Sequence, residues 1–394
     1  MMFTVKWRGS TYEDEELEDL FAPILTSEGI CYTFNIMDRS EVFTKNVAHY
    51  TDYFSTNGKL SEWSVETGYS EKAGTEAYPK RTIMAGVKGG LSITFLVNGD
   101  DLDFVCGDSL QGFKITLHHP GEIPRVKQKY LRVPLDHSIV ASIKPNMMTT
   151  ADGLVSYKPE DRQCYFSSEK SLKFFNSYNQ QNCLLECLTD FCLDYCGCVA
   201  FQMPRENSTP ICGAINLGCT EQAKAKFLES EVAYKIQHSG KNSKNKDEPH
   251  EKSASEKCNC LPSCASLDFD LDSSQSAWDW KEYLKVESQT SKWNAKETRT
   301  FNNSHFSRLV LFFKEMQFMT SERNELYGQT EFFANCGGLL GLCMGFSVIS
   351  AFEIVYYLTL RIVCNLKKYG RRYWSGSEEL LESREESKNK NDQT

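Results

Sequence analysis

The residues of this chain whose types and spacing could do chemistry lie in one apolar segment near the C-terminus. Between Glu331 and Glu353 there are 21 uncharged residues, which at about 1.5 Å of rise per residue make a helix long enough to cross a hydrocarbon core of about 30 Å. A carboxylate in lipid costs about 2.5 to 3.5 kcal/mol or more, so we expect Glu353 to face protein or water. Small and polar residues accompany it, namely Asn335, Gly337, Gly338, Gly341, Gly345, Ser347 and Ser350. Alternatively, these glycines serve close helix packing, and Glu353 pairs with a neighbouring helix.

The cysteines are the second chemically informative group. The chain has 16 of them, and all but three precede the apolar segment. Their density between Cys164 and Cys264 is typical of a disulfide framework in an oxidising compartment. The spacing from Cys258 to Cys264 would also permit a zinc site, an alternative that an extracellular location disfavours. The sequence alone does not choose among the possible cysteine pairings.

The histidines give no catalytic pattern. None falls in a metal-binding or nucleophile-base motif; the seven are His49, His118, His119, His137, His238, His250 and His305. The excess of acidic residues before the apolar segment would raise the local concentration of cations, or is simply a soluble acidic surface. We therefore expect no enzymatic activity, no resident cofactor or metal, and no nucleic-acid partner.

The flanks of the apolar segment indicate its orientation. Basic residues directly follow it and predict a cytoplasmic C-terminus: Arg361, Lys367, Lys368, Arg371 and Arg372. The residues before it are then extracellular, in agreement with the cysteines and with glycosylation sequons at Asn207 and Asn302. No apolar signal sequence opens the chain, so we expect it to be incomplete, with a further membrane segment in its missing start.

The strands expected in the extracellular part come mostly before the helices. Alternation of apolar and polar residues predicts strands at 29–35, 129–140 and 308–319. Over 86–121 it predicts an antiparallel sheet with hairpins at Asn98-Gly99 and near Gly107-Asp108.

Apolar residues at helical spacing predict helices at 167–198, 221–236 and 276–286. In the first of these the apolar stripe is Leu172, Phe175, Cys183, Cys187 and Phe191, and in the second it is Ala225, Leu228, Val232 and Ile236. Residues 238–257 contain no large apolar side chain and predict a disordered surface loop.

Six motifs occur in an order that resembles one family. They are GICYTFN (29–35), QGFKITLHHPGEIP (111–124), NCLLEC (182–187), CGCVAFQMPR (196–205), CNCLPSC (258–264) and GGLLGLCMGFSVISAFEIVYY (337–357). This combination resembles the degenerin, epithelial sodium channel and acid-sensing ion channel superfamily, in particular its insect pickpocket branch. The resemblance implies an α+β membrane protein. A disulfide-rich β-sheet palm and β-ball, with a helical thumb, finger and knuckle, would stand over two transmembrane helices, and three subunits would surround one pore.

The resemblance also implies a nested set of disulfides in the thumb. The pairs are Cys164–Cys264, Cys183–Cys260, Cys187–Cys258, Cys196–Cys219 and Cys198–Cys212. Cys31 matches a family cysteine whose partner follows the first transmembrane helix, and Cys106 and Cys192 have no assigned partner. We expect Cys336, Cys343 and Cys364 to be free, with palmitoylation an alternative for Cys364.

The implied pore residues lie in the apolar segment. The family selectivity filter, a Gly-x-Ser tripeptide, matches Gly345, Phe346 and Ser347, and glycine there would let three backbones approach the axis and turn carbonyl oxygens toward a cation. Gly341 matches the ring at which amiloride blocks relatives, and Ala334 a position at which bulky residues hold degenerins open. Glu353 matches an inner-pore carboxylate, which either attracts cations or anchors a neighbouring helix.

The sequence therefore predicts a subunit of a trimeric, amiloride-sensitive, sodium-selective channel in the plasma membrane, with a sensory role. Residues 1–330 would be extracellular, with the thumb at about 164–264; residues 331–364 would form the pore-lining second transmembrane helix; and residues 365–394 would be cytoplasmic. The expected partners are sodium ions, related subunits in a homo- or heterotrimer, and membrane lipid. A non-conducting regulatory subunit and a single-pass receptor or adhesion protein are the alternatives.

Overall fold

The computed structural model comprises two compact units, Met1–Arg323 and Asn324–Thr394. The residues that it describes are 2–48, 54, 58–105, 109–239, 258–290, 301, 303–326, 328–345, 347–369, 371 and 377–391. The first unit thus ends a few residues before the boundary at residue 330 that we expected from sequence.

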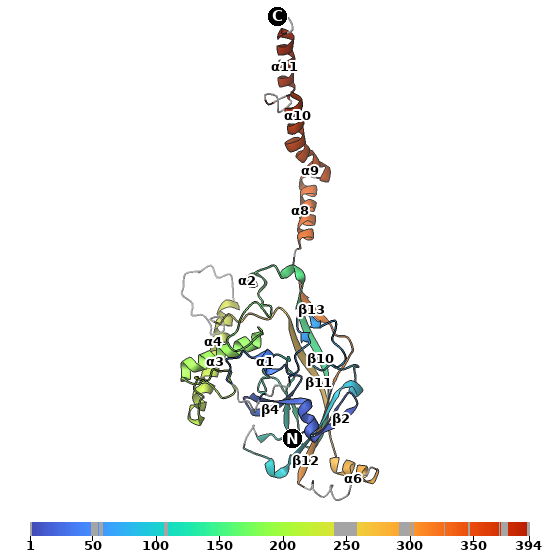
Figure 1. The fold of residues 1–394 in the computed structure, drawn as a ribbon, viewed down its shortest axis with the longest axis vertical. Coiled ribbons are helices and arrows are strands. Elements are labelled where there is room, and N and C mark those ends of the chain that lie inside the picture. Colours follow the sequence, from blue (N-terminus) through green and yellow to red (C-terminus); the bar gives the residue numbers. More distant parts are fainter. Residues whose placement is uncertain are drawn as a thin grey trace. The chain divides into compact units, whose positions relative to one another are not determined.

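A mixed sheet forms the centre of the first unit (Figure 1). Within the described residues it has seven strands in the order β11-β10-β12-β7-β1-β2, and β13 pairs with the end of β10. Their bounds are β1 (Met2–Trp7), β2 (Ser10–Glu13), β7 (Leu91–Asn98), β10 (His137–Thr150), β11 (Ser266–Ala277), β12 (Ser304–Phe313) and β13 (Thr320–Arg323).

Alternation along β7 shows why this sheet forms. Leu91, Ile93 and Phe95 are buried, while the intervening Ser92 and Thr94 point to the opposite face. β7 and β12 pair in antiparallel register, and β10 and β12 pair in parallel. The resulting core contains Val5, Trp7, Leu20, Phe21, Leu91, Ile93, Phe95, Val133, Ile139, Ala141, Leu309 and Leu311.

Three two-stranded hairpins flank the sheet. They are β3 (Phe21–Thr26) with β4 (Gly29–Phe34), β5 (Trp63–Ser64) with β6 (Gly68–Tyr69), and β8 (Phe113–Ile115) with β9 (Leu131–Val133). The strand predicted at 29–35 is confirmed as β4. A second core cluster packs beside these hairpins, where the rings of Phe43 and Phe175 stack with centroids 5.2 Å apart.

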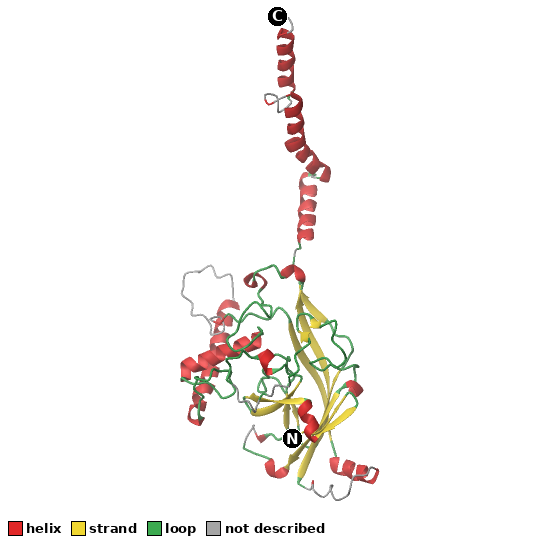
Figure 2. Cartoon of the chain, viewed as in Figure 1, coloured by secondary structure: helices red, strands yellow, loops and turns green. Residues whose placement is uncertain are grey.

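The two longest helices described in the first unit, α3 (Gln180–Cys196) and α4 (Leu217–Ser239), lie together on one side of the sheet, and α6 (Trp280–Thr290) lies apart from them (Figure 2). Two short helices are α1 (Arg39–Val42) and α2 (Pro159–Arg162). Short 3₁₀ turns are η1 (Asp14–Asp19), η3 (Val87–Gly89), η4 (Gly99–Asp101), η6 (Asp152–Leu154) and η7 (Ala214–Asn216). α3 and α4 pack against each other through Phe191 and Phe227, whose ring centroids lie 5.7 Å apart.

Three helix predictions need correction. The helix expected over 167–198 begins only at Gln180, because Phe174 and Phe175 are buried in the second cluster and Asn179 caps the start of α3. The helix at 221–236 forms as part of α4, but its stripe at Leu228, Val232 and Ile236 is exposed. The buried side chains among the described residues of α4 include Thr220, Ala223 and Phe227. The helix expected at 276–286 starts at Trp280, after β11.

The hairpin predicted at Asn98-Gly99 is wrong. β7 pairs instead with β1 and β12, and η4 follows it. The glycine is needed because a Cβ at Gly99 would lie 2.5 Å from Oδ1 of Asn303, next to β12. The second predicted hairpin, at Gly107-Asp108, and most of the loop predicted at 238–257 lie outside the described residues. The strand expected over 308–319 ends at Phe313, and β13 begins at Thr320.

The second unit is helical. Its elements are α8 (Gln329–Met344), α9 (Val348–Val355), the π-helical turn η9 (Tyr356–Leu360), α10 (Arg361–Tyr369) and α11 (Glu378–Asn391). The single helix that we expected across 331–364 is therefore interrupted between α8 and α9.

Candidate functional site

The apolar segment is interrupted at the predicted Gly-x-Ser tripeptide. α8 ends because Gly345 adopts the left-handed conformation, with φ of 64°, and its N–H donates to the carbonyl of Gly341 at 2.9 Å. A residue with a Cβ would be strained at this φ. Phe346 lies outside the described residues.

The helix restarts at Ser347 through a reciprocal cap. Ser347 is extended, with φ of −118° and ψ of 169°, and its Oγ accepts the backbone N–H of Ser350 at 3.3 Å. The Oγ of Ser350 accepts the N–H of Ser347, also at 3.3 Å. This arrangement is a capping box, in which each serine satisfies a backbone donor of the other. Our sequence interpretation named Ser350 only as a small polar residue of the apolar segment and did not predict its capping role, although two serines three residues apart before an apolar run could have signalled the box.

The interruption exposes backbone polar groups within an apolar segment. A helix end leaves up to four carbonyls, and a helix start up to four N–H groups, without partners inside the helix. In a bilayer such a break is tolerated only where it is buried in protein or lines a water-filled cavity. The break between Gly345 and Ser347 therefore indicates a segment that does not simply face lipid.

A polar stripe runs along the helix after the break. Ser350, Glu353 and Tyr357 recur at spacings of three and four residues, so they share one face. Glu353 is exposed in this single chain, and no ion pair to it occurs in the part of the chain that the structure describes. The opposite face consists of large apolar side chains, among them Val348, Phe352 and Val355.

Small residues mark one face of α8. Ala334, Gly338 and Gly341 recur at spacings of four and three residues, which places them on the same side of the helix. A Cβ built on Gly337 or Gly338 would meet nothing within 4 Å. Packing within this chain therefore does not require these two glycines, and they leave room for another helix to approach.

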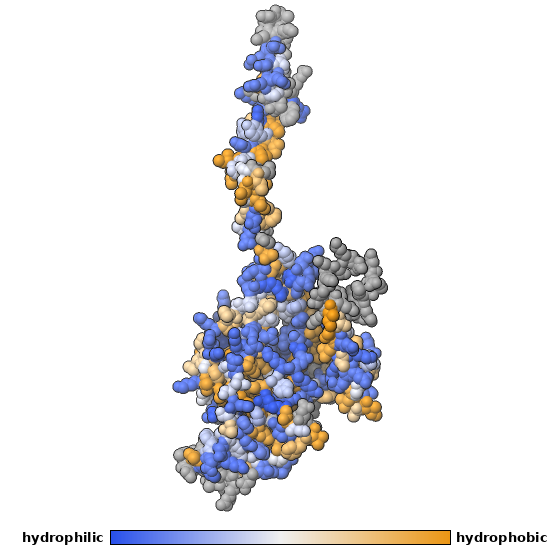
Figure 3. All heavy atoms as spheres, turned by 180° about the vertical axis from the view of Figure 1, so that it is seen from behind, coloured by the Kyte–Doolittle hydropathy of each residue, from blue (hydrophilic) through white to orange (hydrophobic). Residues whose placement is uncertain are grey.

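One helix among the described residues, Val348–Lys368, has the length and apolar composition needed to cross a membrane. Figure 3 shows hydrophobic side chains gathered on the surface of the second unit before its hydrophilic end. The guanidinium of Arg361 lies over the ring of Tyr357, 5.0 Å from the centroid. Cys336, Cys343 and Cys364 are free thiols.

Five disulfides connect the helical part of the first unit. Their pairs are Cys164–Cys264, Cys183–Cys260, Cys187–Cys258, Cys196–Cys219 and Cys198–Cys212, the same pairs that the family resemblance implied. Three of them are nested and bind the residues around α3 to residues 258–264. Cys31 and Cys192 are free, and Cys106 lies outside the described residues.

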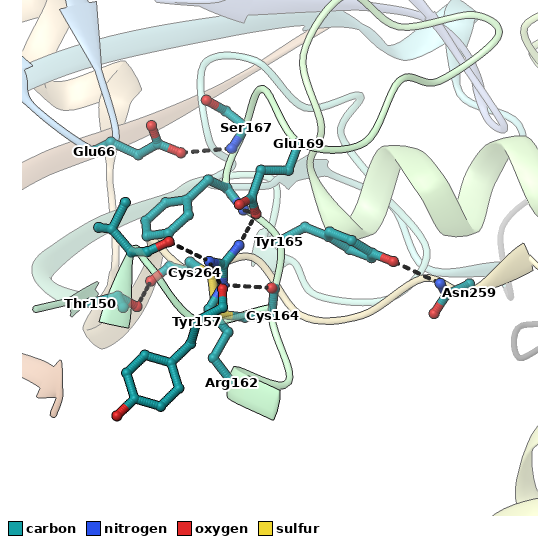
Figure 4. Close-up of polar contacts among 12 residues, drawn as sticks. Glu66, Thr150, Tyr157, Arg162, Cys164, Tyr165, Ser167, Glu169, Asn259 and Cys264 are labelled. Carbon is teal, nitrogen blue, oxygen red and sulfur yellow. Dashed lines mark hydrogen bonds and ion pairs between the residues drawn. A yellow bond between two sulfur atoms is a disulfide. The ribbon is translucent and has the colours of Figure 1, made fainter. Parts of the chain in front are cut away.

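A buried arginine makes hydrogen bonds beside the outermost disulfide, Cys164–Cys264 (Figure 4). The side chain of Arg162 is fully buried and donates to the carbonyls of Tyr157 at 2.8 Å and of Cys164 at 3.2 Å. It also forms an ion pair with Glu169. On the other side of the disulfide, Thr150 at the end of β10 donates to the carbonyl of Cys264 at 2.7 Å.

This junction continues to the last residue of the first unit. The N–H of Ala151, directly after β10, donates to the carbonyl of Arg323 at 3.0 Å. The outermost disulfide is therefore hydrogen-bonded through Cys264 to the end of β10, and the end of β10 is in turn hydrogen-bonded to the end of β13.

A half-buried acid lies between the sheet and α3. Glu122 accepts a hydrogen bond from Nδ2 of Asn179 at 2.8 Å, and burial raises the pKa of Glu122 to about 7. Burial lowers the pKa of nearby His119 to about 4. Burial also lowers the pKa of His118, so both imidazoles of the His118-His119 pair are neutral at pH 7, and both follow β8 outside any strand.

Two predicted glycosylation acceptors remain, Asn207 and Asn302. Asn207 is exposed, as a glycosylation acceptor must be, whereas Asn302 lies outside the described residues. Within the described residues no group of three or more histidines, cysteines or acids could hold a metal ion.

Comparison with known proteins shows which family the chain resembles. A sequence profile described as amiloride-sensitive sodium channel matches residues 1–357. The chain is 27% identical to pickpocket protein 28 of Drosophila melanogaster over 372 residues, which are 93% of this chain and 57% of that protein.

Two less similar proteins also match most of this chain. The chain is 26% identical to pickpocket protein 11 of Drosophila melanogaster, over 70% of this chain and 47% of that protein. It is 22% identical to human acid-sensing ion channel 2, over 78% of this chain and 53% of the relative. The chain thus spans about half the length of the curated relatives that it matches.

Proposed function

Because the chain belongs to the amiloride-sensitive sodium channel family, whose members are ion channels and not enzymes, we propose that it is a subunit of a trimeric, sodium-selective cation channel. The observation that carries this proposal is the interruption of the apolar helix at Gly345–Ser347. It supplies exposed backbone groups and a polar stripe where a permeating cation needs them.

Each pore residue has a distinct proposed role. Three copies of the Gly345–Ser347 segment would turn backbone carbonyls toward the axis and replace part of the hydration shell of a sodium ion. Gly341, one turn earlier on α8, would form the ring at which amiloride blocks. Ala334 would permit closure because it is small, and Glu353 on the polar stripe would attract cations toward the inner pore.

The proposed location is the plasma membrane, with the disulfide-bonded unit extracellular and the C-terminus cytoplasmic. A homo- or heterotrimer with related subunits, surrounded by lipid, is the proposed assembly, and a sensory role is proposed from the pickpocket relatives. The disulfide framework supports the extracellular placement, because disulfides persist in oxidising compartments.

The decisive experiment is electrical. The chain is expressed in cells without amiloride-sensitive current, alone and together with pickpocket protein 28, and the sodium current and its block by amiloride are recorded. We expect the co-expressed chain to contribute a sodium-selective current that differs from that of the relative alone. Suppression of the relative's current would instead favour a non-conducting regulatory subunit. An unchanged current, with no assembly between the two chains, would favour a single-pass receptor.

The filter assignment has its own test. An aspartate in place of Gly345 or Ser347 would add a ring of charge and, at Gly345, backbone strain. We expect Gly345→Asp and Ser347→Asp to shift the reversal potential measured between sodium and potassium solutions. A reversal potential equal to that of the unmodified chain would show that ions are selected elsewhere.

A further inference from the structure

We propose that Ser350 is a positioning residue for ion selectivity, because its side chain holds Ser347 in the extended conformation from which α9 starts. This inference rests on the proposed channel function and extends it to a residue outside the Gly-x-Ser tripeptide. Ser350 would act through Ser347 and would not itself bind the permeating ion.

The argument starts from the donors at the start of α9. Four N–H groups lack helical partners there, and in an apolar surrounding each would favour a continuous helix over a break. The capping box satisfies two of them, because Ser350 Oγ accepts from the N–H of Ser347 and Ser347 Oγ accepts from the N–H of Ser350. The two hydroxyl oxygens also lie 3.3 Å apart, within hydrogen-bonding distance.

The same contacts determine which groups of Ser347 remain available to an ion. Its N–H and its hydroxyl are both engaged with Ser350, and its carbonyl accepts the N–H of Ala351 at 3.1 Å. The last carbonyls of α8, which ends at Met344, have no N–H donor within that helix, and together with the carbonyl of Gly345 they would be the backbone groups that contact the cation. Ser350 therefore keeps the serine of the tripeptide in a structural role and fixes the direction of the chain as it leaves Gly345.

The test uses two variants of nearly equal shape. Ser350→Thr keeps a hydroxyl on Cβ, whereas Ser350→Val replaces that hydroxyl with a methyl group. Thr359→Val is the matched control, because the hydroxyl of Thr359 donates to the carbonyl of Val355 four residues earlier in the same unit. All three changes leave net charge unaltered.

Hydrogen exchange is measured first, on the full chain in lipid nanodiscs, because it does not require current. We expect amides in the peptide covering 347–351 to exchange about fivefold faster in Ser350→Val than in Ser350→Thr, the factor by which loss of a typical N-cap shifts a helix equilibrium. Equal exchange in the two variants would overturn the proposal.

Permeability is measured second, in the co-expressed channel. We expect the sodium-to-potassium permeability ratio to fall by about fivefold in Ser350→Val and to be retained in Ser350→Thr and Thr359→Val. Faster exchange with an unchanged ratio would overturn the positioning role while leaving the channel function intact. Absence of sodium current from every version would contradict the proposed function itself, and the exchange comparison would still decide whether Ser350 holds the break.

Discussion

Arg162 shows how a single side chain can support a whole framework. Its guanidinium makes hydrogen bonds in a fixed fork, which suits simultaneous contact with several carbonyls and a carboxylate. Because the side chain is buried, its loss would leave those acceptors without donors.

We expect Arg162→Gln to lower the free energy of unfolding by about 3 kcal/mol, since it breaks a buried ion pair and its hydrogen bonds. The measurement is thermal denaturation of the purified full chain. Lys173→Gln is the control, because its pair with Glu206 is half-exposed and should contribute less than about 1 kcal/mol. Equal losses in both variants would contradict the role that we assign to Arg162.

Glu122 predicts a dependence of stability on pH. Its pKa is raised from 4.5 to about 7, so the folded chain binds this proton more tightly than the unfolded chain does. Its contribution to stability is therefore complete below about pH 4.5 and is lost as the pH rises through about 7.

The variant Glu122→Gln remains neutral and keeps an oxygen for Asn179. We expect it to be more stable than the unmodified chain at pH 8 by about 2 kcal/mol, and equally stable at pH 4, below the ordinary pKa of the carboxyl. His119 contributes stability with the opposite pH dependence, which is lost as the pH falls from 6.5 toward 4. Because both chains contain His119, comparing their melting temperatures with each other at each of the two pH values cancels this contribution. A stability difference that does not change with pH would show that folding leaves the pKa of Glu122 unshifted. Glu76→Gln, at an exposed ion pair, is the control.

At the scale of elements, the local sequence pattern predicted whether a segment forms a strand or a helix. It did not predict which other element that segment packs against or pairs with. The strand at 29–35 and the helix at 221–236 follow from alternation and helical spacing, which are properties of neighbouring residues. The pairing of β7 with β12 joins segments about 200 residues apart, and no local signal contains it. The stripe on α4 misled us because periodicity identifies a face without saying whether that face is covered.

The candidate site shows the same limit. The Gly-x-Ser position was readable from the resemblance, whereas the run of apolar residues favoured one continuous helix. The break depends on the left-handed φ of Gly345 and on the hydroxyl of Ser350, and hydropathy measures neither of them. The strand β1 was missed because its residues follow directly on Met1 without the turn signals that bound other strands.

The nested disulfides predict unequal consequences of their removal. Cys164 and Cys264 are 100 residues apart, for which loop closure alone would give about 4.7 kcal/mol. With Cys183–Cys260 intact, however, the extra loop contains only residues 164–183 and 260–264. We therefore expect removal of the outer disulfide by alanine to cost about 3 kcal/mol, similar to removal of Cys198–Cys212, which closes 14 residues. Thermal denaturation of both double variants checks this, and a much larger loss for the outer pair would contradict it.

At the scale of the whole molecule, the proposed orientation can be checked by glycosylation. Asn207 lies on the exposed surface of the first unit. If that unit is extracellular, digestion with an N-glycosidase should increase the electrophoretic mobility of the chain, and the combined variant Asn207→Gln with Asn302→Gln should abolish the shift. Protein that reaches the cell surface without any glycan at either position would argue against the assignment of these sequons.

The pairing of β10 has a consequence for how this chain can change in length. β10 aligns Ser138–Ile143 with β12 and Met147–Thr150 with β13, so two separate strands take their positions from one template. Residues 315–319, which connect those strands, are exposed and do not set where β13 lies. Insertions there, whether of a reporter peptide in the laboratory or of new sequence during evolution, would lengthen the connection while β13 keeps its register against β10.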